Sequence, residues 1–192
     1  NAINMYVDRD IDKLMERTRN RPLVTGAISP RNALVFAVVL EILAFGVLWV
    51  GANLLSAVLA LSATAFYVGI YTLWLKRTSR QNIVLGGAAG AAPVRVGWAA
   101  GQTDLSWTPI VLFGVMFFWT PPHFWALAIK YADDYRAANV PMLPAVVPFE
   151  HAVRQMVGHT LAMVTCSLIL IPVADLGLLY SVTAVVLGAT FI

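Results

Sequence analysis

The chain has 192 residues, of which 59% are hydrophobic and only 12% are charged. Soluble domains usually carry about 25% charged residues, so the composition excludes an ordinary soluble domain and predicts an all-α, polytopic transmembrane helical bundle. Basic residues of such proteins collect on one membrane side, so the formal net charge of +3 does not indicate a nucleic-acid partner. The single cysteine, Cys166, excludes a disulfide framework and a thiolate metal site.

The chain begins with a polar stretch, residues 1–23, in which Asn4, Asp8 and Asp12 recur at every fourth position. On a helix this spacing places the three side chains on one face. Three arginines follow at alternate positions: Arg17, Arg19 and Arg21. Amide and carboxylate oxygens are ligands of Mg²⁺, and guanidinium groups bind phosphate oxygens in pairs. The stretch predicts a Mg²⁺–diphosphate site; a solvated helix end with local ion pairs is the alternative.

Five apolar runs are long enough to cross a bilayer, which takes about 20 helical residues, and a sixth begins near the end. Their bounds are 32–50, 56–75, 82–101, 108–129 and 151–173, with the sixth at 177–192. Pro30 and Gly51 are placed to start and end the first span. We expect residues 1–192 to form one membrane-embedded domain, truncated at both ends.

The basic residues predict how the spans are oriented. If the first 31 residues are cytoplasmic and the spans alternate, all of the 13 Lys and Arg residues except Arg95 fall on that side. The opposite links contain only Asp104 and Asp175 as charged residues. This is the positive-inside pattern, and it predicts a site that opens toward the cytoplasmic face of the inner (plasma) membrane.

A second acidic segment follows the fourth span. It contains Asp133 and Asp134, flanked by Lys130 and Tyr135 as candidate substrate contacts. Two acidic helix ends at one membrane face would share two Mg²⁺ ions and clamp a diphosphate, whose leaving charge the metal neutralises. An ordinary charged loop is the alternative.

The second span ends in a basic segment that contains Lys76 and Arg77, with Asn82 just beyond it. These residues either set the topology or contact phosphate, or a second anionic substrate such as a propionate.

The third span is rich in glycine, and its small-xxx-small spacings predict close helix packing. Pro93 should kink this span. Arg95 is unusual, because a mid-membrane charge costs about 2.5–3.5 kcal/mol to insert. It should face a cavity or a partner, for which Glu41 is the candidate. Pairing and ligand binding remain open for Arg95.

The fourth span contains Pro121, Pro122 and His123 among aromatic residues. We expect the prolines to break the backbone hydrogen-bond ladder where a cavity lies alongside. His123 is either a satisfied core residue or a functional one, in which case a flat macrocycle stacks on the aromatic rings and the imidazole approaches its iron. We expect His151 and His159 to be structural.

Several blocks resemble one known family. The box formed by Asn4, Asp8 and Asp12 resembles the first motif of the UbiA superfamily of intramembrane prenyltransferases. The segments ERTRNRPLVTGAISP, YTLWLKRTSRQNIVLGGAAGA, WTPPHFWALAIKYADDY and NVPMLP are similar to the branch of this superfamily that farnesylates heme. The resemblance covers most of residues 1–144. The second motif of the superfamily is usually Asp-x-x-x-Asp, whereas here the residue four after Asp134 is Ala138.

The resemblance implies nine helices in the intact protein and a Mg²⁺-dependent transfer of farnesyl from farnesyl diphosphate to a vinyl group of heme b. The product, heme O, would supply terminal oxidases, with an oxidase assembly factor or heme A synthase as a possible partner. The first motif and Asp134 would bind the metal and diphosphate. Four basic residues would contact phosphate or heme propionates: Arg17, Arg21, Lys76 and Arg77. Asn1 and His123 match heme-branch positions, whereas Arg95 stands where this branch commonly has an uncharged residue.

Two other functions compete with this one. A related prenyltransferase would act on an aromatic acid or a quinone precursor, but a small phenolic acceptor has no need of the segment around His123. A heme transporter or chaperone is a different class, and a transport pathway should carry polar groups at both mouths.

Overall fold

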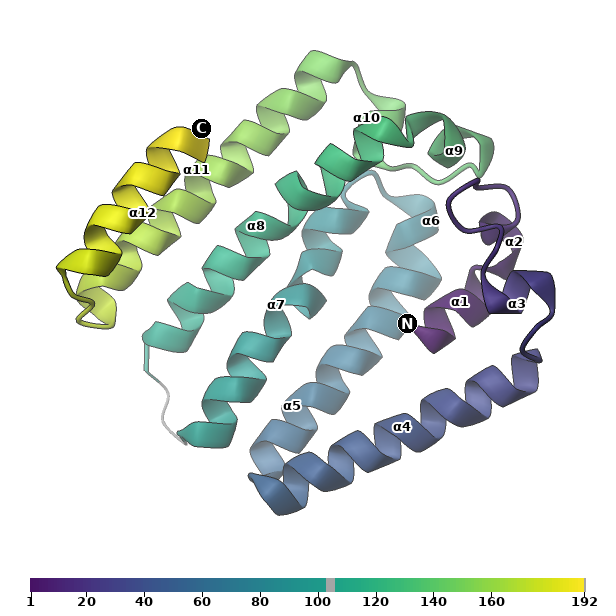
Figure 1. Ribbon diagram of the computed structural model, residues 1–192, viewed down its shortest axis with the longest axis horizontal. Helices are drawn as coiled ribbons and strands as arrows, with labels where there is room; N and C mark the ends of the chain where they lie inside the picture. The colour runs from purple at the N-terminus through teal and green to yellow at the C-terminus, as the bar shows by residue number, and fades with distance from the viewer. Residues whose placement is uncertain (103–105, 192) are drawn as a thin grey trace.

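All regular structure in residues 1–102 and 106–191, which this computed structural model describes, is helical. The long helices are α4 (Pro30–Gly51), α5 (Leu54–Ala65) with its continuation η1 (Phe66–Leu75), α7 (Asn82–Gly101), α8 (Thr108–Lys130), α11 (Phe149–Val173) and α12 (Leu178–Phe191). They form an open arc in which α12, α11, α8, α7, α5 and α4 follow one another (Figure 1). The short helices are α1 (Ala2–Val7), α2 (Arg9–Asp12), α3 (Pro22–Thr25), α6 (Lys76–Thr78), α9 (Ala132–Ala137) and α10 (Leu143–Val146).

Five helical segments are long and apolar enough to cross a bilayer, so the predicted polytopic fold is confirmed. Their bounds are Pro30–Gly51, Leu54–Thr78, Asn82–Gly101, Thr108–Lys130 and Phe149–Val173. The expected sixth span corresponds to α12, which has 14 residues. Asp104 and Ile192, which entered the predictions on orientation and on the sixth span, lie outside the described residues.

Two spans begin slightly earlier than predicted because polar side chains cap them. The Ser29 hydroxyl accepts a hydrogen bond from the Asn32 amide at 3.2 Å, and Pro30 occupies the first turn of α4. The Asn53 side chain accepts from the Ser56 amide at 2.9 Å, so α5 begins at Leu54. Apolar length alone placed these boundaries two residues too late.

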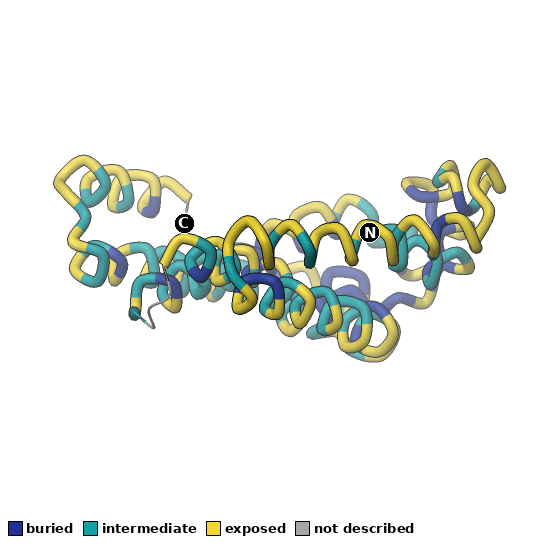
Figure 2. The backbone as a smooth tube through the Cα atoms, turned by 90° about the horizontal axis from the view of Figure 1, so that it is seen from below, coloured by how far each residue is buried: buried dark blue, intermediate teal, exposed yellow. Residues whose placement is uncertain are grey.

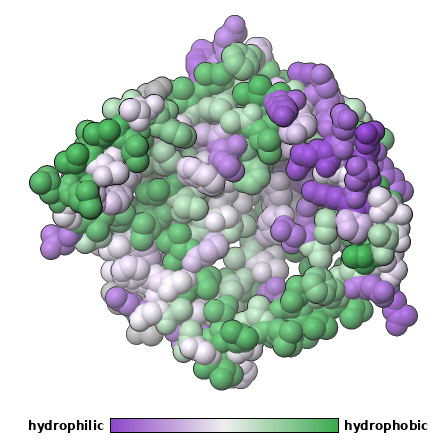
Figure 3. All heavy atoms as spheres, viewed as in Figure 1, coloured by the Kyte–Doolittle hydropathy of each residue, from purple (hydrophilic) through white to green (hydrophobic). Residues whose placement is uncertain are grey.

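The short helices α1, α2, α3, α6, α9 and α10 gather at one end of the bundle, which we call the polar end (Figure 1). Figure 3 shows hydrophilic residues concentrated over the same region. Lys76 and Arg77 in α6, Lys130 at the end of α8 and Arg154 in the second turn of α11 all belong to this end. The predicted grouping of basic residues at one end is therefore present in the fold.

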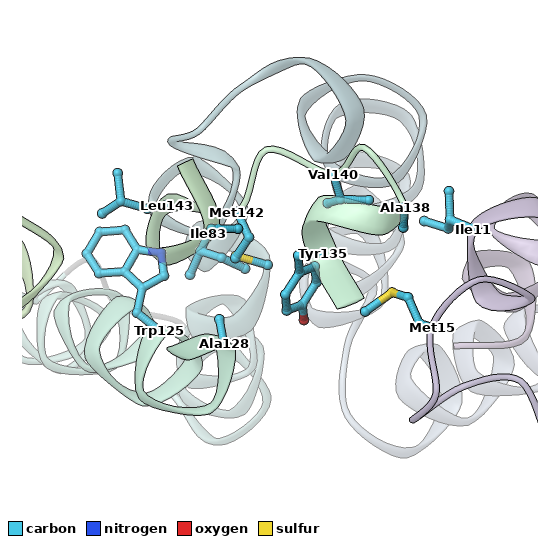
Figure 4. Close-up of a cluster of buried hydrophobic side chains, with 11 residues drawn as sticks. Ile11, Met15, Ile83, Trp125, Ala128, Tyr135, Ala138, Val140, Met142 and Leu143 are labelled. Carbon is cyan, nitrogen blue, oxygen red and sulfur yellow. The ribbon is translucent and has the colours of Figure 1, made fainter. Parts of the chain in front are cut away.

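The buried core also lies at the polar end. Ile11 and Met15 pack in one cluster with Ile83, Trp125 and the α9–α10 segment (Figure 4). Along the spans, by contrast, most residues are exposed or only partly buried (Figure 2). In α4, for example, Ala33 is the one residue that is buried among those described. Exposed apolar span faces are what a bilayer covers, whereas the polar end is held together by protein contacts.

The fourth span runs through its prolines as one helix. Pro121 and Pro122 are both buried inside α8, which continues from Thr108 to Lys130. Because proline has no amide hydrogen, the backbone ladder lacks two donors there, and a transmembrane helix tolerates this loss when neighbouring helices pack around it. Pro93 likewise lies inside a continuous α7.

The second span contains a π-helix that nothing in the sequence predicted. In η1 the Thr72 hydroxyl donates a hydrogen bond at 3.0 Å to the Tyr67 carbonyl, five residues earlier. The rings of Tyr67 and Tyr71 stack with their centroids 5.4 Å apart. π-helical turns occur frequently at functional sites. Here the turn presents Tyr67, Tyr71 and Thr72 to α1, which η1 contacts.

The glycines of α7 give a test of its packing. A Cβ atom at Gly86 would lie 2.4 Å from Cδ2 of Tyr71, whereas one at Gly97 would have no neighbour within 4 Å. We expect Gly86→Ala to lower the free energy of unfolding by about 1–3 kcal/mol through overpacking. Gly97→Ala is the matched control and should be neutral or stabilising by up to about 1 kcal/mol, because alanine favours helices. Thermal unfolding in detergent measures both; equal unfolding temperatures would contradict the prediction.

Candidate functional site at the polar end

The site begins with the acidic face of α1 and α2. The Asp8 amide donates to the Asn4 carbonyl at 2.9 Å, and the Asp12 amide donates to the Asp8 carbonyl at 2.8 Å. This helical continuity puts the three side chains on one face, as their spacing predicted. The Asn4 amide group donates to Oδ2 of Asp8 at 2.6 Å. Asp8 is fully buried and Asp12 is 2% exposed, so the face points into the protein.

Basic residues from distant parts of the chain neutralise these carboxylates. Lys76 of α6 forms a hydrogen-bonded ion pair with Oδ2 of Asp8. The Arg21 guanidinium donates to both oxygens of Asp12, at 3.0 and 2.7 Å. Three of the predicted phosphate ligands, Lys76, Arg77 and Arg21, therefore lie directly beside the predicted metal ligands.

Arg77 links the buried and exposed parts of this network. Its guanidinium donates to both oxygens of Asp10 at 2.7 Å and lies 3.7 Å from Oδ1 of Asp8. The hydrogen bond from Arg77 lowers the pKa of Asp10 from 3.8 to about 2. The Asp10 carboxylate is therefore ionised at neutral pH, and its contribution to stability is lost only as the pH falls from about 4 through 2. Because Asp10 is 62% exposed, this contribution is small.

The second acidic segment reaches the same end of the bundle. Oδ2 of Asp134 accepts a hydrogen bond at 3.0 Å from the backbone amide of Glu16. Asp133 points away, is 97% exposed and pairs with Arg136. The two acidic segments meet as expected, but through Asp134 alone. Tyr135 is buried in the core cluster and links it to the site.

Other predicted contacts surround this junction. The Arg17 guanidinium lies 5.8 Å from the centre of the Tyr131 ring, and the Lys130 ammonium lies 5.6 Å from the same centre. Asn82 is fully buried, and its amide donates to the Lys76 carbonyl at 3.5 Å. The side-chain oxygen of Asn82 has no hydrogen-bond partner in the described structure.

A cavity of about 890 Å³ lies beside the acidic face. It is open on one side and lined by α1, α4, α5, η1, α7 and α8, and alanines and glycines form much of its wall. Asn1 and Ile3 line it, as do Tyr67 and Tyr71. Asn4 follows Ile3 directly and approaches the Thr72 hydroxyl at 3.5 Å. Asn4, Asp8 and Asp12 are not among the described lining residues, so the cavity lies next to the acidic face and runs along the apolar part of the bundle.

Two predicted residues lie elsewhere. His123 is exposed and stacks on Trp119, with the ring centroids 4.2 Å apart. Its neighbour Phe124 lines the cavity, but His123 is not among the described lining residues. Arg95 is exposed and also stands outside that lining. In the described part of the chain no ion pair joins Arg95 to Glu41, so the expected pair is wrong. Glu41 belongs to α4 and Arg95 to α7, and α5 packs against both of these helices.

The oxygen ligands that the protein supplies fit Mg²⁺ only if phosphate oxygens of the substrate fill the remaining coordination positions. Among the described residues no group of three or more His, Cys, Asp or Glu side chains is placed to hold a metal. However, Oδ1 of Asp8 is buried without a hydrogen-bond partner, and the Asn4 amide group, turned toward Asp8, leaves its own oxygen free to bind. Mg²⁺ is usually bound by one or two carboxylates together with phosphate oxygens and water. The orphaned oxygen of Asp8 is thus consistent with a site that phosphate shares.

Sequence reasoning missed four residues of this site. Thr72, Tyr67 and Tyr71 are placed by the π-helix, for which the sequence carries no periodic signal. Glu41 was considered only as a partner for Arg95. The occurrence of Tyr67 and Tyr71 four residues apart, just before Lys76, is the one signal that would have pointed to them.

The fold and this site define a multi-pass helical membrane protein with a charged site at one end of an apolar cavity. The chain belongs to the UbiA prenyltransferase family, which it matches over residues 1–192.

Several curated relatives carry the same name. This chain is 54% identical over 195 residues to the "Protoheme IX farnesyltransferase" of Frankia alni, covering 100% of this chain and 66% of the relative. It is also 54% identical to the proteins of that name from Pseudarthrobacter chlorophenolicus and Kineococcus radiotolerans, covering all of this chain and 60% and 57% of those relatives. The chain thus spans between 57% and 66% of their length. No solved structure matches it.

Proposed function

We propose that the protein containing this chain transfers the farnesyl group of farnesyl diphosphate to a vinyl carbon of heme b, releases diphosphate and gives heme O. The observation that carries this proposal is a carboxylate–cation site that begins at Asn4, next in the chain to Ile3, which lines an apolar cavity of about 890 Å³. A diphosphate needs the first and a long isoprenoid chain needs the second. The identity to relatives named "Protoheme IX farnesyltransferase" supports heme b as the acceptor and farnesyl diphosphate as the donor.

The ion pairs provide the diphosphate site. Lys76 and Arg21 neutralise Asp8 and Asp12 before substrate binds. Asn4 and Asp8 would hold Mg²⁺ through their oxygens, and Lys76 and Arg21 would contact phosphate oxygens. The metal would neutralise negative charge that grows on diphosphate as the carbon–oxygen bond breaks. The same two cations thus neutralise carboxylates in the free site and are close enough to serve phosphate in the loaded one.

The cavity provides for the farnesyl group and its cation. Small side chains such as Ala60, Ala63 and Gly90 leave room for the chain. The stacked rings of Tyr67 and Tyr71 border the cavity next to the acidic face and stabilise an allylic cation through their π-electrons. Heme b would approach with its propionates toward the basic polar end. We further propose that this end faces the cytoplasm, that the protein lies in the inner membrane, and that heme O passes to a terminal oxidase or heme A synthase.

An assay on the full-length protein in membranes or detergent tests the proposal. Heme b, farnesyl diphosphate and Mg²⁺ are supplied, and the pigment is separated by chromatography and weighed by mass spectrometry. We expect a hydroxyethylfarnesyl product that is lost when the metal is chelated. Prenylation of an added phenolic acid with unchanged heme would instead assign a different acceptor. Heme binding without transfer would favour a transporter or chaperone.

A further inference from the structure

Glu41 is a carboxylate in the middle of a membrane span, and no described residue pairs with it. It stands halfway along α4 and lines the cavity, where it is half-buried. Among the described lining residues it is the one acidic side chain; the rest are apolar or carry an amide, hydroxyl or phenol group. Across the described structure no hydrogen bond or ion pair holds its carboxylate. An ionisable group inside a membrane is costly unless it serves a cavity or a partner, so this one needs a role.

The other carboxylates near the cavity are already engaged. Asp8 and Asp12 are paired with Lys76 and Arg21. In the proposed reaction, oxygens of the first motif also take part in binding the metal. Glu41 stands apart from this set, on the α4 side of the same cavity, while α1 packs against both α4 and η1. Glu41 is therefore the acidic residue of the described lining that remains available to react with the organic substrates.

The proposed reaction leaves one proton to be accepted. The bond between farnesyl C1 and oxygen breaks, and diphosphate leaves with the electron pair. The vinyl double bond then supplies two electrons for the new carbon–carbon bond, which leaves a cation on the vinyl carbon attached to the porphyrin. Water adds its oxygen to that carbon, and the resulting oxonium must lose one proton to give the alcohol.

We propose that Glu41 is the general base that takes this proton from the adding water. The proposal rests on the proposed function. The Glu41 carboxylate becomes a carboxylic acid in this step, and it returns the proton to solvent before the next turnover. Its negative charge also stabilises the cation beforehand, in an apolar cavity where electrostatic interactions are strong. This role explains why the span keeps an acidic group that no cation neutralises.

The test compares Glu41→Gln with Glu150→Gln in the full-length protein. Glu150 is an exposed residue in the first turn of α11, outside the described cavity lining, and so provides a matched control. General bases usually contribute at least about 100-fold to a rate, and we expect kcat for alcohol formation to fall by about that factor in Glu41→Gln. KM for farnesyl diphosphate should not change. Glu41→Asp, which keeps the carboxylate, should restore part of the activity.

The product ratio gives a readout that does not depend on how much protein folds. Without a base to complete hydration, the cation is expected to lose a proton from the neighbouring carbon. The product is then a farnesylated alkene that lacks one water relative to the alcohol. A raised alkene-to-alcohol ratio in Glu41→Gln, with the wild-type ratio in Glu150→Gln, supports the proposal. Wild-type rate and ratio in Glu41→Gln would overturn it. If the wild-type protein itself makes neither product, the proposed function fails instead.

Discussion

Asp8→Asn is expected to reduce farnesyl transfer about 1000-fold while leaving the protein folded. Asparagine keeps the shape of aspartate and can still accept from the Asn4 amide, but it removes the charge that holds the metal and balances Lys76. A loss of about 4 kcal/mol of electrostatic stabilisation of the transition state corresponds to three powers of ten in rate. Single-turnover assays with heme b and farnesyl diphosphate measure the effect, and thermal unfolding verifies the fold.

Asp10→Asn is the matched control for this prediction. Asp10 lies two residues from Asp8, and both contact Arg77, yet its side chain is 62% exposed and points to solvent. Removing its charge should leave the transfer rate close to that of the wild-type protein. Equal losses in the two variants would mean that the acidic segment contributes only a general negative potential, and the assignment of Asp8 as a metal ligand would fail.

The acidic face illustrates what the sequence could predict. Its four-residue spacing and the 3.6-residue helical period are enough to place Asn4, Asp8 and Asp12 together, because this is a local property. The positions of the spans follow in the same way from apolar length. The positive-inside pattern grouped Lys76 with the acidic segment at one end of the bundle. It did not predict that Lys76 would bind Asp8 across 68 positions of the chain, since that contact depends on how α6 packs against α1.

Helix packing explains the predictions that were wrong or incomplete. Glu41 was the candidate partner of Arg95, but their helices, α4 and α7, both pack against α5, and the order of helices in the bundle is not readable from the sequence. Asp133 and Asp134 are consecutive, and neighbouring positions on a helix do not face the same way. Asp134 therefore turns toward the segment after α2, where it contacts the Glu16 amide, while Asp133 turns outward. The sequence carries no comparable spacing that would predict the π-helix, because the wider turn depends on how η1 packs against α1 and α7.

Lys76→Met is expected to destabilise the protein by up to about 3 kcal/mol, because it removes the hydrogen-bonded partner of the buried Asp8 carboxylate and leaves only the Arg77 guanidinium, 3.7 Å from Oδ1. Lys76 is 14% exposed and Asp8 is fully buried, so water cannot replace the lost hydrogen bond. Methionine preserves most of the side-chain volume, which limits any packing defect. Thermal unfolding in detergent measures the change, with Arg136→Met as control, since the Arg136–Asp133 pair is exposed.

Combining Lys76→Met with Asp8→Asn separates the structural role of the pair from its chemical role. The double variant has no buried unpaired charge, so most of the lost stability should return, and the two effects should be strongly non-additive. Activity should not return, because both the metal oxygen and the phosphate cation are then missing. Recovery of transfer together with stability would show that the pair only holds α1 against α6. If neither stability nor transfer returns, the defect lies in packing. The proposal that Lys76 leaves Asp8 to contact phosphate would then lose its support.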